Sequence, residues 1–288
     1  MRVATSPQEL GGGERVVALG TFDGVHLGHR RVIESALAVG LQETVVTFDP
    51  HPRTALGNRV ELISTLERRL ELIDSLGVTE ALVLPFTPDL ALVTPEEFAR
   101  TVLQPMGAKA VLAGANFRFG RGRSGDLDLL AGLGFDARPV PLVEGVSSSR
   151  IRQLVAAGEV DRAAKLLGRP VEVEGTVVAG DARGGTLGFP TANLAVPSEL
   201  LVPAFGIYAG EALGHRAATS IGVNPHYGGE ERRVEAFLLD YEGDLYGRRL
   251  IVELWARLRD ERAFDSEDEL VAQIAQDVEA TQTAERPV

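Results

Sequence analysis

The stretch "ALGTFDGVHLGHRRV", residues 18–32, joins the end of an apolar run to the start of an amphipathic segment. Residues 15–20 predict a buried strand, and residues 27–39 predict a helix with one apolar face. Two of the five histidines of the chain, His26 and His29, stand at the start of that helix. The sequence therefore predicts a strand, a glycine-bounded loop and a helix, with two imidazoles at the mouth of the helix.

The same alternation of strands and helices continues along the first half of the chain. Further strands are predicted at residues 44–48, 79–84 and 109–113. Ser64 and Glu67 have capping-box spacing and predict the start of a helix that Gly77 ends. Thr94, followed by Pro95 and two glutamates, predicts a second helix over 95–104. This order indicates a doubly wound parallel sheet, in which ligands bind at the carboxyl ends of the strands.

The second half of the chain has a different sequence pattern. Five β-rich segments follow one another, separated by Gly, Asn or Pro turns, at 171–179, 206–213, 215–223, 232–240 and 249–258. They predict a small antiparallel β-barrel. A capping box at Ser266 and Glu269 starts a terminal helix over 267–282. We therefore expect two domains, residues 1–168 with the parallel sheet and residues 169–288 with the barrel.

Composition excludes several classes of protein. The 288 residues are 44% hydrophobic, enough to bury a sizeable core, and none is cysteine, which excludes disulfides and Cys-ligated metals. The net charge of −12 argues against nucleic acid as a partner. No apolar run approaches the roughly 20 residues that span a membrane, and the N-terminus lacks signal-peptide layout, so we expect a cytoplasmic protein. The two lysines, Lys109 and Lys165, lie in no Walker-type loop.

The loop that contains the two histidines has the properties of a phosphate site. Gly20 and Gly24 allow close approach of the backbone to a ligand, and a helix that begins near Leu27 directs its free N–H groups at that point. His26 and His29 can add hydrogen-bond donors or positive charge as negative charge develops on a transferring phosphorus. The alternative is a helix-capping histidine beside a surface histidine.

The motif H-x-G-H on the first helix resembles the nucleotidyltransferase superfamily. With "TFDGVHLGHR" (21–30) the chain more closely resembles the prokaryotic bifunctional riboflavin kinase/FAD synthetase family. Three more stretches of that family occur in the expected order: "TFDPHP" (47–52), "GANFRFGRGRSGD" (114–126) and "VSSSRIR" (146–152). The resemblance implies catalytic roles for His26 and His29, and ATP-binding or flavin-binding roles for Gly20, Phe22, Asp23, Asn116, Arg118, Arg123, Ser147, Ser148 and Arg150.

The Gly/Arg loop also fits a different pattern. Gly120, Gly122 and Gly125 have the spacing of a dinucleotide-binding fingerprint. They lie more than a hundred residues into the chain, however, and we expect no helix to open directly behind them. A NAD site is therefore disfavoured, and the arginines of this loop act either as pyrophosphate clamps or as solvated side chains.

A second candidate site opens the β-rich half, in "GTVVAGDARGGTLGFPTANL" (175–194). Thr191 and Asn193 offer hard oxygen atoms two residues apart, which suit Mg²⁺ and its attached phosphates. A glycine-rich barrel turn without a ligand is the alternative. "LGFPTANL" (187–194) resembles the riboflavin kinase domain, and this implies nucleotide-binding roles for Gly180, Gly188, Pro190, Thr191 and Asn193, with Thr191 and Asn193 as the metal ligands.

The stretch "VEAFLLDYEGDLYGRRLIVELWARLRDERAFDS" (234–266) continues the resemblance to the riboflavin kinase domain, and the resemblance implies that Glu235 is the base of this second site. An alcohol is a poor nucleophile at neutral pH, so phosphorylation of a ribityl hydroxyl needs a carboxylate or similar base. A glutamate on a strand beside Arg232 and Arg233 is otherwise a solvent-facing ion-pair partner. The chain departs from the family pattern at Gly185, where arginine is usual, and at His226, where threonine is common.

The resemblance covers residues 14–282 and implies two reactions. Riboflavin and ATP would give FMN and ADP in the C-terminal domain, and FMN and ATP would give FAD and pyrophosphate in the N-terminal domain, both with Mg²⁺. Three alternatives remain: an adenylyltransferase for nicotinate mononucleotide or phosphopantetheine, a class I aminoacyl-tRNA synthetase, and a flavin-binding protein without kinase activity. The P-T-A-N stretch argues against the first, and the scarcity of lysine argues against the second.

Overall fold

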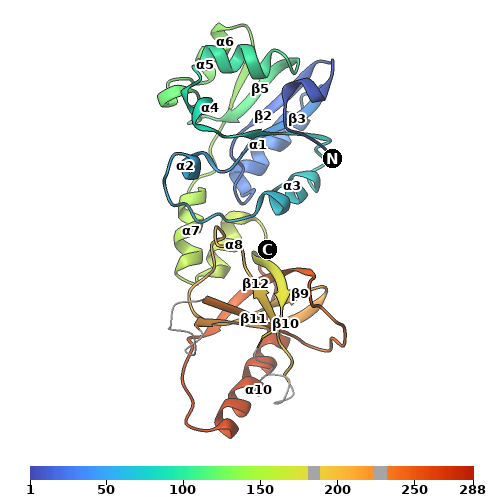
Figure 1. Cartoon of the computed structure of the whole chain (residues 1–288), viewed down its shortest axis with the longest axis vertical. Helices are drawn as coiled ribbons and strands as arrows, with labels where there is room; N and C mark the ends of the chain where they lie inside the picture. Colours follow the sequence, from blue (N-terminus) through green and yellow to red (C-terminus); the bar gives the residue numbers. More distant parts are fainter. Residues whose placement is uncertain (181–188, 224–231) are drawn as a thin grey trace. The chain divides into compact units, whose positions relative to one another are not determined.

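The computed structural model describes residues 1–180, 189–223 and 232–288. The chain divides into two compact units, Met1–Ser148 and Ser149–Val288 (Figure 1). The helices between residues 148 and 167 thus fall in the second unit, whereas the sequence predicts a domain boundary at 168/169. The predicted boundary at 168/169 assigns the residues of the chain to one or the other activity, and this assignment stays a prediction.

The first unit contains a six-stranded parallel sheet with the strand order β1-β4-β3-β2-β5-β6. The strands are β1 (Arg2–Ala4), β2 (Arg15–Leu19), β3 (Gln42–Asp49), β4 (Glu80–Pro85), β5 (Ala108–Gly114) and β6 (Asp136–Val140). The predicted doubly wound parallel sheet is confirmed. The two edge strands were not predicted, because β1 has three residues and β6 contains a proline and charged side chains without apolar alternation.

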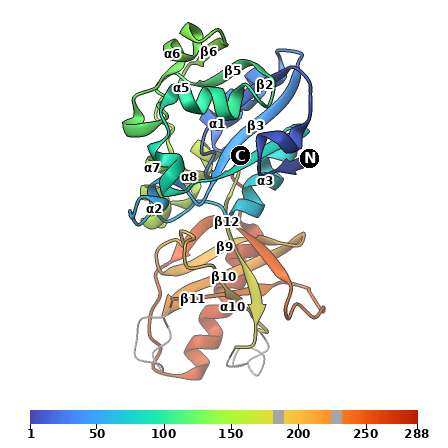
Figure 2. The ribbon, with the colours of Figure 1, turned by 45° about the horizontal axis from the view of Figure 1, so that its top comes forward.

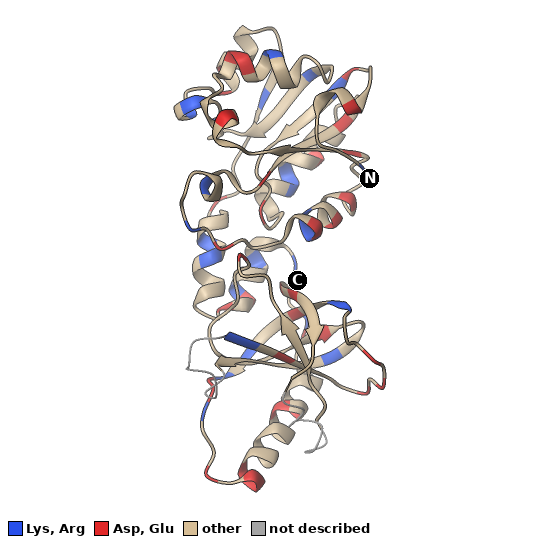
Figure 3. Cartoon of the chain, in the orientation of Figure 1, with Lys and Arg blue, Asp and Glu red and all other residues tan. Residues whose placement is uncertain are grey.

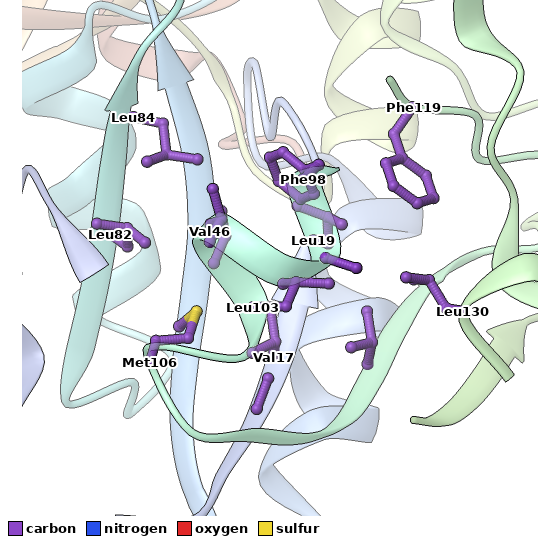
Figure 4. Close-up of a cluster of buried hydrophobic side chains, with 14 of the residues drawn as sticks. Val17, Leu19, Val46, Leu82, Leu84, Phe98, Leu103, Met106, Phe119 and Leu130 are labelled. Atoms are coloured by element: carbon purple, nitrogen blue, oxygen red, sulfur yellow. The ribbon is translucent and has the colours of Figure 1, made fainter. Parts of the chain in front are cut away.

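Helices cover both faces of this sheet (Figure 2). They are α1 (Leu27–Leu37), α2 (Pro52–Ala55), α3 (Leu66–Asp74), α4 (Pro88–Leu92), α5 (Pro95–Phe98) and α6 (Leu127–Gly132). On β2, Val17 and Leu19 point into a core that includes Phe98 of α5 (Figure 4), whereas Val16 and Ala18 point into a core that includes Ile33 of α1. Burial on both faces explains why β2 is an uninterrupted apolar run in the sequence.

One of the two predicted helix-capping residues in this unit is confirmed, and the other is wrong. The capping box at Thr94 and Glu97 is present in both directions, although α5 continues beyond Phe98 as a π-helix over Ala99–Leu103. The prediction that Ser64 caps the next helix is wrong. Thr65 caps α3 instead, because the Ser64 hydroxyl is buried and accepts a hydrogen bond from the Gly24 amide at 3.1 Å.

The second unit contains a closed barrel with the strand order β10-β11-β8-β7-β12-β9, which β9 and β10 close. Its antiparallel strands are β7 (Val171–Val178), β8 (Ala192–Ala195), β9 (Gly206–Ala212), β10 (His215–Val223), β11 (Arg232–Leu238) and β12 (Arg249–Arg259). The predicted antiparallel barrel is confirmed. The sixth strand, β8, was not predicted because its four residues follow a glycine-rich stretch without alternation.

Alternation along the strands separates the interior of the barrel from its outer surface. On β12, Leu250, Val252 and Leu254 are buried, whereas Arg249 and Glu253 lie on the opposite face. On β11, Val234 and Ala236 are buried in the same way. Polar residues that flank these positions therefore lie on the outer surface, where a ligand can reach them.

Within the described residues of the second unit, three helices accompany the barrel: α7 (Ser148–Ala156), α8 (Val160–Leu167) and α10 (Glu267–Thr283). α8 contacts β7 and β12, and α10 contacts β9 and β10. An ion pair of 2.7 Å between Arg259 and Asp277 ties α10 to β12. The first turn of α10 is acidic (Figure 3), and the Ser266 hydroxyl accepts from the Glu269 amide at 3.2 Å, so the predicted cap is confirmed.

Candidate active sites

The turn between β2 and α1 has an unusual backbone. Phe22, Gly24 and Val25 have φ angles of 51°, 76° and 38°, all in the left-handed region. Each non-glycine residue there costs on the order of 1–3 kcal/mol, so the surroundings must hold the turn in place. Phe22 is buried, and a Cβ added at Gly20 would lie 3.1 Å from its ring. Gly20 therefore has a packing role beneath the turn, whatever it does for a ligand.

The two histidines stack against each other at the N-terminus of α1. Their ring centroids are 3.6 Å apart with an interplanar angle of 13°, and Phe22 meets His29 edge-on at 5.3 Å. His26 is the N-cap, and its Nδ1 accepts a hydrogen bond from the His29 amide at 3.2 Å. The alternative of a helix-capping histidine is therefore confirmed for His26, and a catalytic role for it stays a prediction.

The Asp23 side chain holds the turn in place through hydrogen bonds to the backbone. Its side chain is fully buried, and its carboxylate accepts from the amides of Ile63 and Ser64 at 3.0 and 3.2 Å. These bonds hold the turn against the segment that leads into α3. A role for Asp23 in binding a nucleotide stays a prediction.

The serine-rich segment lies beside the same turn. The Ser148 hydroxyl donates to the Asp23 carbonyl at 3.5 Å, and Val146 lies 4.0 Å from the position of a Cβ on Gly28. The structure thus brings the "VSSS" segment and the histidine turn together within the first unit. Ser147 immediately precedes this contact, whereas Arg150 belongs to the second unit and its place in the phosphate site stays a prediction.

The Gly/Arg loop follows β5, at the same carboxyl edge of the sheet as the histidine turn. Asn116 comes two residues after β5 ends, and Arg118 donates to the Phe117 carbonyl at 2.9 Å and lies 3.8 Å from Asp126. Arg123 is exposed, with a left-handed φ of 58°. The exposed arginines are accessible to a phosphate, and their contact with one stays a prediction.

Two of the three glycines of this loop, Gly120 and Gly125, are required by packing rather than by a dinucleotide. Paired backbone bonds between Phe119 and Gly125 close the loop, and Cβ atoms on Gly120 or Gly125 would lie 2.7 or 2.6 Å from Pro95. The expectation that no helix follows is wrong, since α6 begins at Leu127. Its N-terminus is occupied by the Asp126 carboxylate, which accepts from Leu129 at 3.0 Å and would repel a pyrophosphate.

The second site forms on the outer surface of the barrel. Asn193 of β8 and Glu235 of β11 are directly opposed in register, and both are half-buried. A Cβ added at Gly180 would lie only 2.2 Å from Nδ2 of Asn193, so the Gly180 backbone lies directly against that amide. Arg233 donates to the Glu235 carboxylate at 2.9 Å. The predicted ion pair of Glu235 is therefore real, and it lies beside the predicted ligand Asn193.

Other predicted residues of this site lie around the start of β8. Thr191 immediately precedes β8 and follows Pro190, and the adjacent Phe189 meets Phe237 of β11 edge-on at 5.5 Å. Gly188, Arg183, Gly185 and His226 lie outside the described residues.

Three positions around the histidine turn received no role of their own in the sequence analysis. Gly28 makes room for the stacked histidines, because a Cβ there would lie 3.2 Å from the His26 ring. The Ser64 hydroxyl accepts from the Gly24 amide of the turn, and Arg69 of α3 donates to the Phe48 carbonyl of β3. Glycine in the first turn of a helix is a signal that could have identified Gly28. The arginine had no such signal, because charged residues on a helix are usually exposed.

Comparisons with known proteins match two family models, one to each half of the chain, in the same order as the two candidate sites. Residues 11–150 match the family model described as FAD synthetase, and residues 167–284 match the model described as riboflavin kinase. In the part of the chain that the structure describes, no helix is long and apolar enough to cross a membrane.

Curated relatives match over almost the whole length. A bifunctional riboflavin kinase/FMN adenylyltransferase of Listeria monocytogenes is 35% identical, covering 93% of this chain and 91% of the relative. The protein of the same name from Escherichia coli is 36% identical, covering 91% and 90%. A crystal structure described as a macrolide-efflux protein from Streptococcus pneumoniae is 35% identical, with a TM-score of 0.89 over 98% of this chain and 99% of that one.

The two matched models and the curated relatives agree with the resemblance found in the sequence. This chain belongs to the family of bifunctional riboflavin kinase/FMN adenylyltransferases.

Proposed function

We propose that the two activities of this enzyme reside at separate sites, FMN adenylyl transfer in residues 1–168 and riboflavin phosphorylation in residues 169–288. The enzyme converts riboflavin and ATP to FMN and ADP, and FMN and ATP to FAD and pyrophosphate. The limits of the two matched models, 11–150 and 167–284, support this division. We place the enzyme in the cytoplasm, because a cysteine-free chain fits a reducing compartment.

In the first reaction, a phosphate oxygen of FMN attacks the α-phosphorus of ATP. One P–O bond forms, the bond from the α-phosphorus to the bridging oxygen breaks, and pyrophosphate leaves. The FMN phosphate is already ionised, so this step needs placement and charge stabilisation rather than a base. Asn116, Arg118, Arg123, Ser147, Ser148 and Arg150 would hold the triphosphate.

The stacked histidines are suited to the developing charge. Because Nδ1 of His26 accepts from the His29 amide, the neutral ring carries its proton on Nε2, where it can donate to a phosphate oxygen. The N-terminus of α1 adds its partial positive charge at the same place. Both effects favour the transition state, in which negative charge accumulates on the phosphoryl oxygens.

In the second reaction, the 5′-hydroxyl of riboflavin attacks the γ-phosphorus of ATP. Glu235 receives the hydroxyl proton, the new O–P bond forms, and ADP leaves with the electrons of the broken bond. Arg233 holds the Glu235 carboxylate in place through a hydrogen bond of 2.9 Å before the proton arrives. Asn193, directly opposite, offers its amide to the nucleotide side of the site.

The oxygen donors of this site fit Mg²⁺. Thr191 and Asn193 supply a neutral hydroxyl and an amide carbonyl, and among the described residues no group of three His, Cys, Asp or Glu could hold a metal instead. Mg²⁺ commonly uses one or two protein ligands together with phosphates and water. When bound, it would neutralise charge on the ATP phosphates; Gly180, Gly188 and Pro190 would shape the loop around them.

The registered pairing of Asn193 with Glu235 carries the kinase assignment, because it places a metal-type donor and a base side by side. The test uses two variants of the full chain, Glu235→Gln and His29→Ala, incubated with Mg-ATP and either riboflavin or FMN. Chromatography separates riboflavin, FMN and FAD. Glu235→Gln is expected to lose FMN formation and keep FAD formation from FMN, and His29→Ala the reverse.

Loss of both activities in either folded single variant would contradict separate sites. Wild-type protein that binds riboflavin but releases no ADP would favour the alternative of a flavin-binding protein with an inactive kinase domain.

A further inference from the structure

Arg69 of α3 has the largest fully buried side chain in the described residues. Its Nη1 donates to the Phe48 carbonyl at 3.0 Å and to the Thr47 hydroxyl at 3.3 Å, both near the carboxyl end of β3. Its Nε and Nη2 have no hydrogen-bond partner in the part of the chain that the structure describes. A buried guanidinium with two unused donors is costly, and such costs are typical of functional sites.

Two carboxylates compensate the buried charge. Burial lowers the pKa of Arg69, and the negative charges of Asp23 and Asp49 act in the opposite direction. An arginine keeps its proton in proteins, so its charge has to be balanced by neighbouring anions. Asp23 is itself fully buried and lies in the histidine turn. Arg69 and Asp23 therefore depend on each other electrostatically.

Hydrogen bonds connect this pair to the residues around the histidines. The Thr47 hydroxyl, which Arg69 contacts, donates to the Thr21 carbonyl at 3.0 Å. On the other side, Asp23 accepts from the amides of Ile63 and Ser64, which lead directly into the helix that carries Arg69. The turn is thus held from β3 and from α3 at once.

The histidine turn needs such support because its backbone is strained. Phe22 and Val25 occupy left-handed conformations that a side chain disfavours. A displacement of the turn would shift His26 and His29 together, because His26 caps the helix on which His29 lies. A shift of about 1 Å in a catalytic group can reduce a rate on the order of 100-fold.

We propose that Arg69 is a positioning residue for FMN adenylyl transfer: its buried charge holds Asp23, and through Asp23 it holds the turn that presents His26 and His29. Arg69 does not touch the substrate. This inference rests on the proposed role of the two histidines. It assigns a function to a side chain that lies outside the motifs of the sequence.

The first experiment replaces Arg69 with methionine in the full chain and measures kcat and KM for both reactions. Adenylyl transfer is expected to lose roughly 10- to 100-fold in kcat, with KM for ATP and FMN changed by less than about threefold. Riboflavin kinase activity in the same samples is expected to stay within about twofold of wild type. Arg69→Lys retains a charge and is expected to recover part of the lost kcat.

Arg68 provides a matched control. It is the neighbouring arginine of α3, it is partly exposed, and it pairs with Glu71 at 2.9 Å. Arg68→Met makes the same chemical change one position away and is expected to leave both activities unaltered.

A double-mutant cycle tests the link to Asp23. Asp23→Asn removes the charge while keeping an acceptor for the two amides, and the combined variant Asp23→Asn/Arg69→Met is expected to lose less kcat than the product of the two single losses. If Arg69→Met does not fold, Thr47→Val replaces it in the experiment. This substitution removes the Thr47 hydroxyl, which links Arg69 to the Thr21 carbonyl, and leaves the bond from Arg69 to Phe48. It is expected to reduce adenylyl transfer severalfold and to spare the kinase.

Four results would overturn the inference: adenylyl transfer by folded Arg69→Met within about twofold of wild type, equal loss of both activities, no recovery in Arg69→Lys, or single losses that multiply in the cycle. Absence of adenylyl transfer in the wild type would instead contradict the proposed function.

Discussion

Asn193 and Glu235 face each other across β8 and β11 as a registered pair on the outer surface of the barrel. Side chains in this relationship have Cβ atoms about 4.5–5.5 Å apart, close enough to act on one bound group. The sequence separates them by 42 positions, and only the antiparallel pairing of a four-residue strand brings them together. Their proximity would allow the proposed metal ligand Asn193 and the proposed base Glu235 to serve one reaction.

Gly180→Ala is expected to impair the kinase selectively. The new Cβ would lie 2.2 Å from Nδ2 of Asn193, so the amide must move away from its place beside Glu235. Steady-state kinetics should show a raised KM for ATP in riboflavin phosphorylation. FAD formation from FMN, measured on the same protein, should be unaffected, and a wild-type kinase KM would show that Asn193 does not contact the nucleotide.

Asn193→Ala is expected to raise the concentration of Mg²⁺ that supports half-maximal kinase activity. The change removes one of two proposed oxygen ligands, so the metal must be held by Thr191, phosphates and water. A titration of riboflavin kinase activity with magnesium at fixed ATP measures the effect. An unchanged requirement for magnesium would exclude Asn193 as a ligand; chelation of the metal should stop the reaction in both proteins.

Gly28→Ala is expected to reduce adenylyl transfer without loss of stability. Alanine favours the helix by about 1 kcal/mol over glycine, but its Cβ would press on the His26 ring at 3.2 Å and disturb the stack with His29. The kcat for FAD formation should fall severalfold, while thermal unfolding stays at or above the wild-type temperature. Gly132→Ala in α6, where a Cβ meets nothing within 4 Å, is the matched control and should leave kcat unaltered.

Arg15→Met is expected to destabilise the first unit by about 3–5 kcal/mol, because the buried Glu80 carboxylate would keep only the exposed Arg2, 3.9 Å away, as an ion-pair partner. Arg15 is 3% exposed, pairs with Glu80 at 2.8 Å, and donates to the Met106 carbonyl at 2.8 Å. Urea denaturation followed by circular dichroism measures the loss. Arg138→Met breaks the exposed pair with Asp136 and should leave stability nearly unchanged, so equal effects of the two substitutions would contradict the argument from burial.

Tyr208 should make the stability of the barrel sensitive to alkaline pH. Burial raises the pKa of Tyr208, which donates to the Ala204 carbonyl at 2.6 Å. An acid with a raised pKa in the folded state contributes stability that is complete below the ordinary value of 10.0 and is lost as pH rises through the folded value.

Tyr208→Phe tests this expectation. At pH 8 the variant should be about 1 kcal/mol less stable than wild type, because one hydrogen bond is lost. The difference should shrink at pH 10.5, since only wild type has a phenol to ionise. Tyr246→Phe, at an exposed position, should follow the wild-type pH dependence; a constant difference between Tyr208→Phe and wild type would contradict the prediction.

The central strands of both units could be predicted from the sequence, because burial on both faces or alternation along a strand leaves a clear apolar pattern. β6 and β8 left no such pattern. Their pairing is set by the strand next to them rather than by their own side chains. The capping residue of α3 was predicted one position early for a related reason: the hydroxyl of Ser64 makes a tertiary bond to Gly24, which local spacing cannot reveal.

Candidate site residues were predictable where chemistry follows a motif. His26 and His29 were found because they stand at a helix start, and Asn193 and Glu235 because oxygen donors and a base suit the reaction. The inward direction of Asp23 and the complete burial of Arg69 were not predictable, because they depend on how α3 packs against β3. Buried residues that position a site without touching its ligand have no sequence motif of their own.

The closed barrel has a consequence for how this enzyme can diversify. Its interior is filled by residues such as Leu250, Val252 and Leu254, while the proposed reactive groups, Asn193 and Glu235, lie on its outer surface. Mutations of the interior residues change the stability of the barrel, whereas mutations on the outer surface change its activity, and each kind has little effect on the other property. A lineage can thus acquire a new flavin preference without first rebuilding the scaffold that carries it.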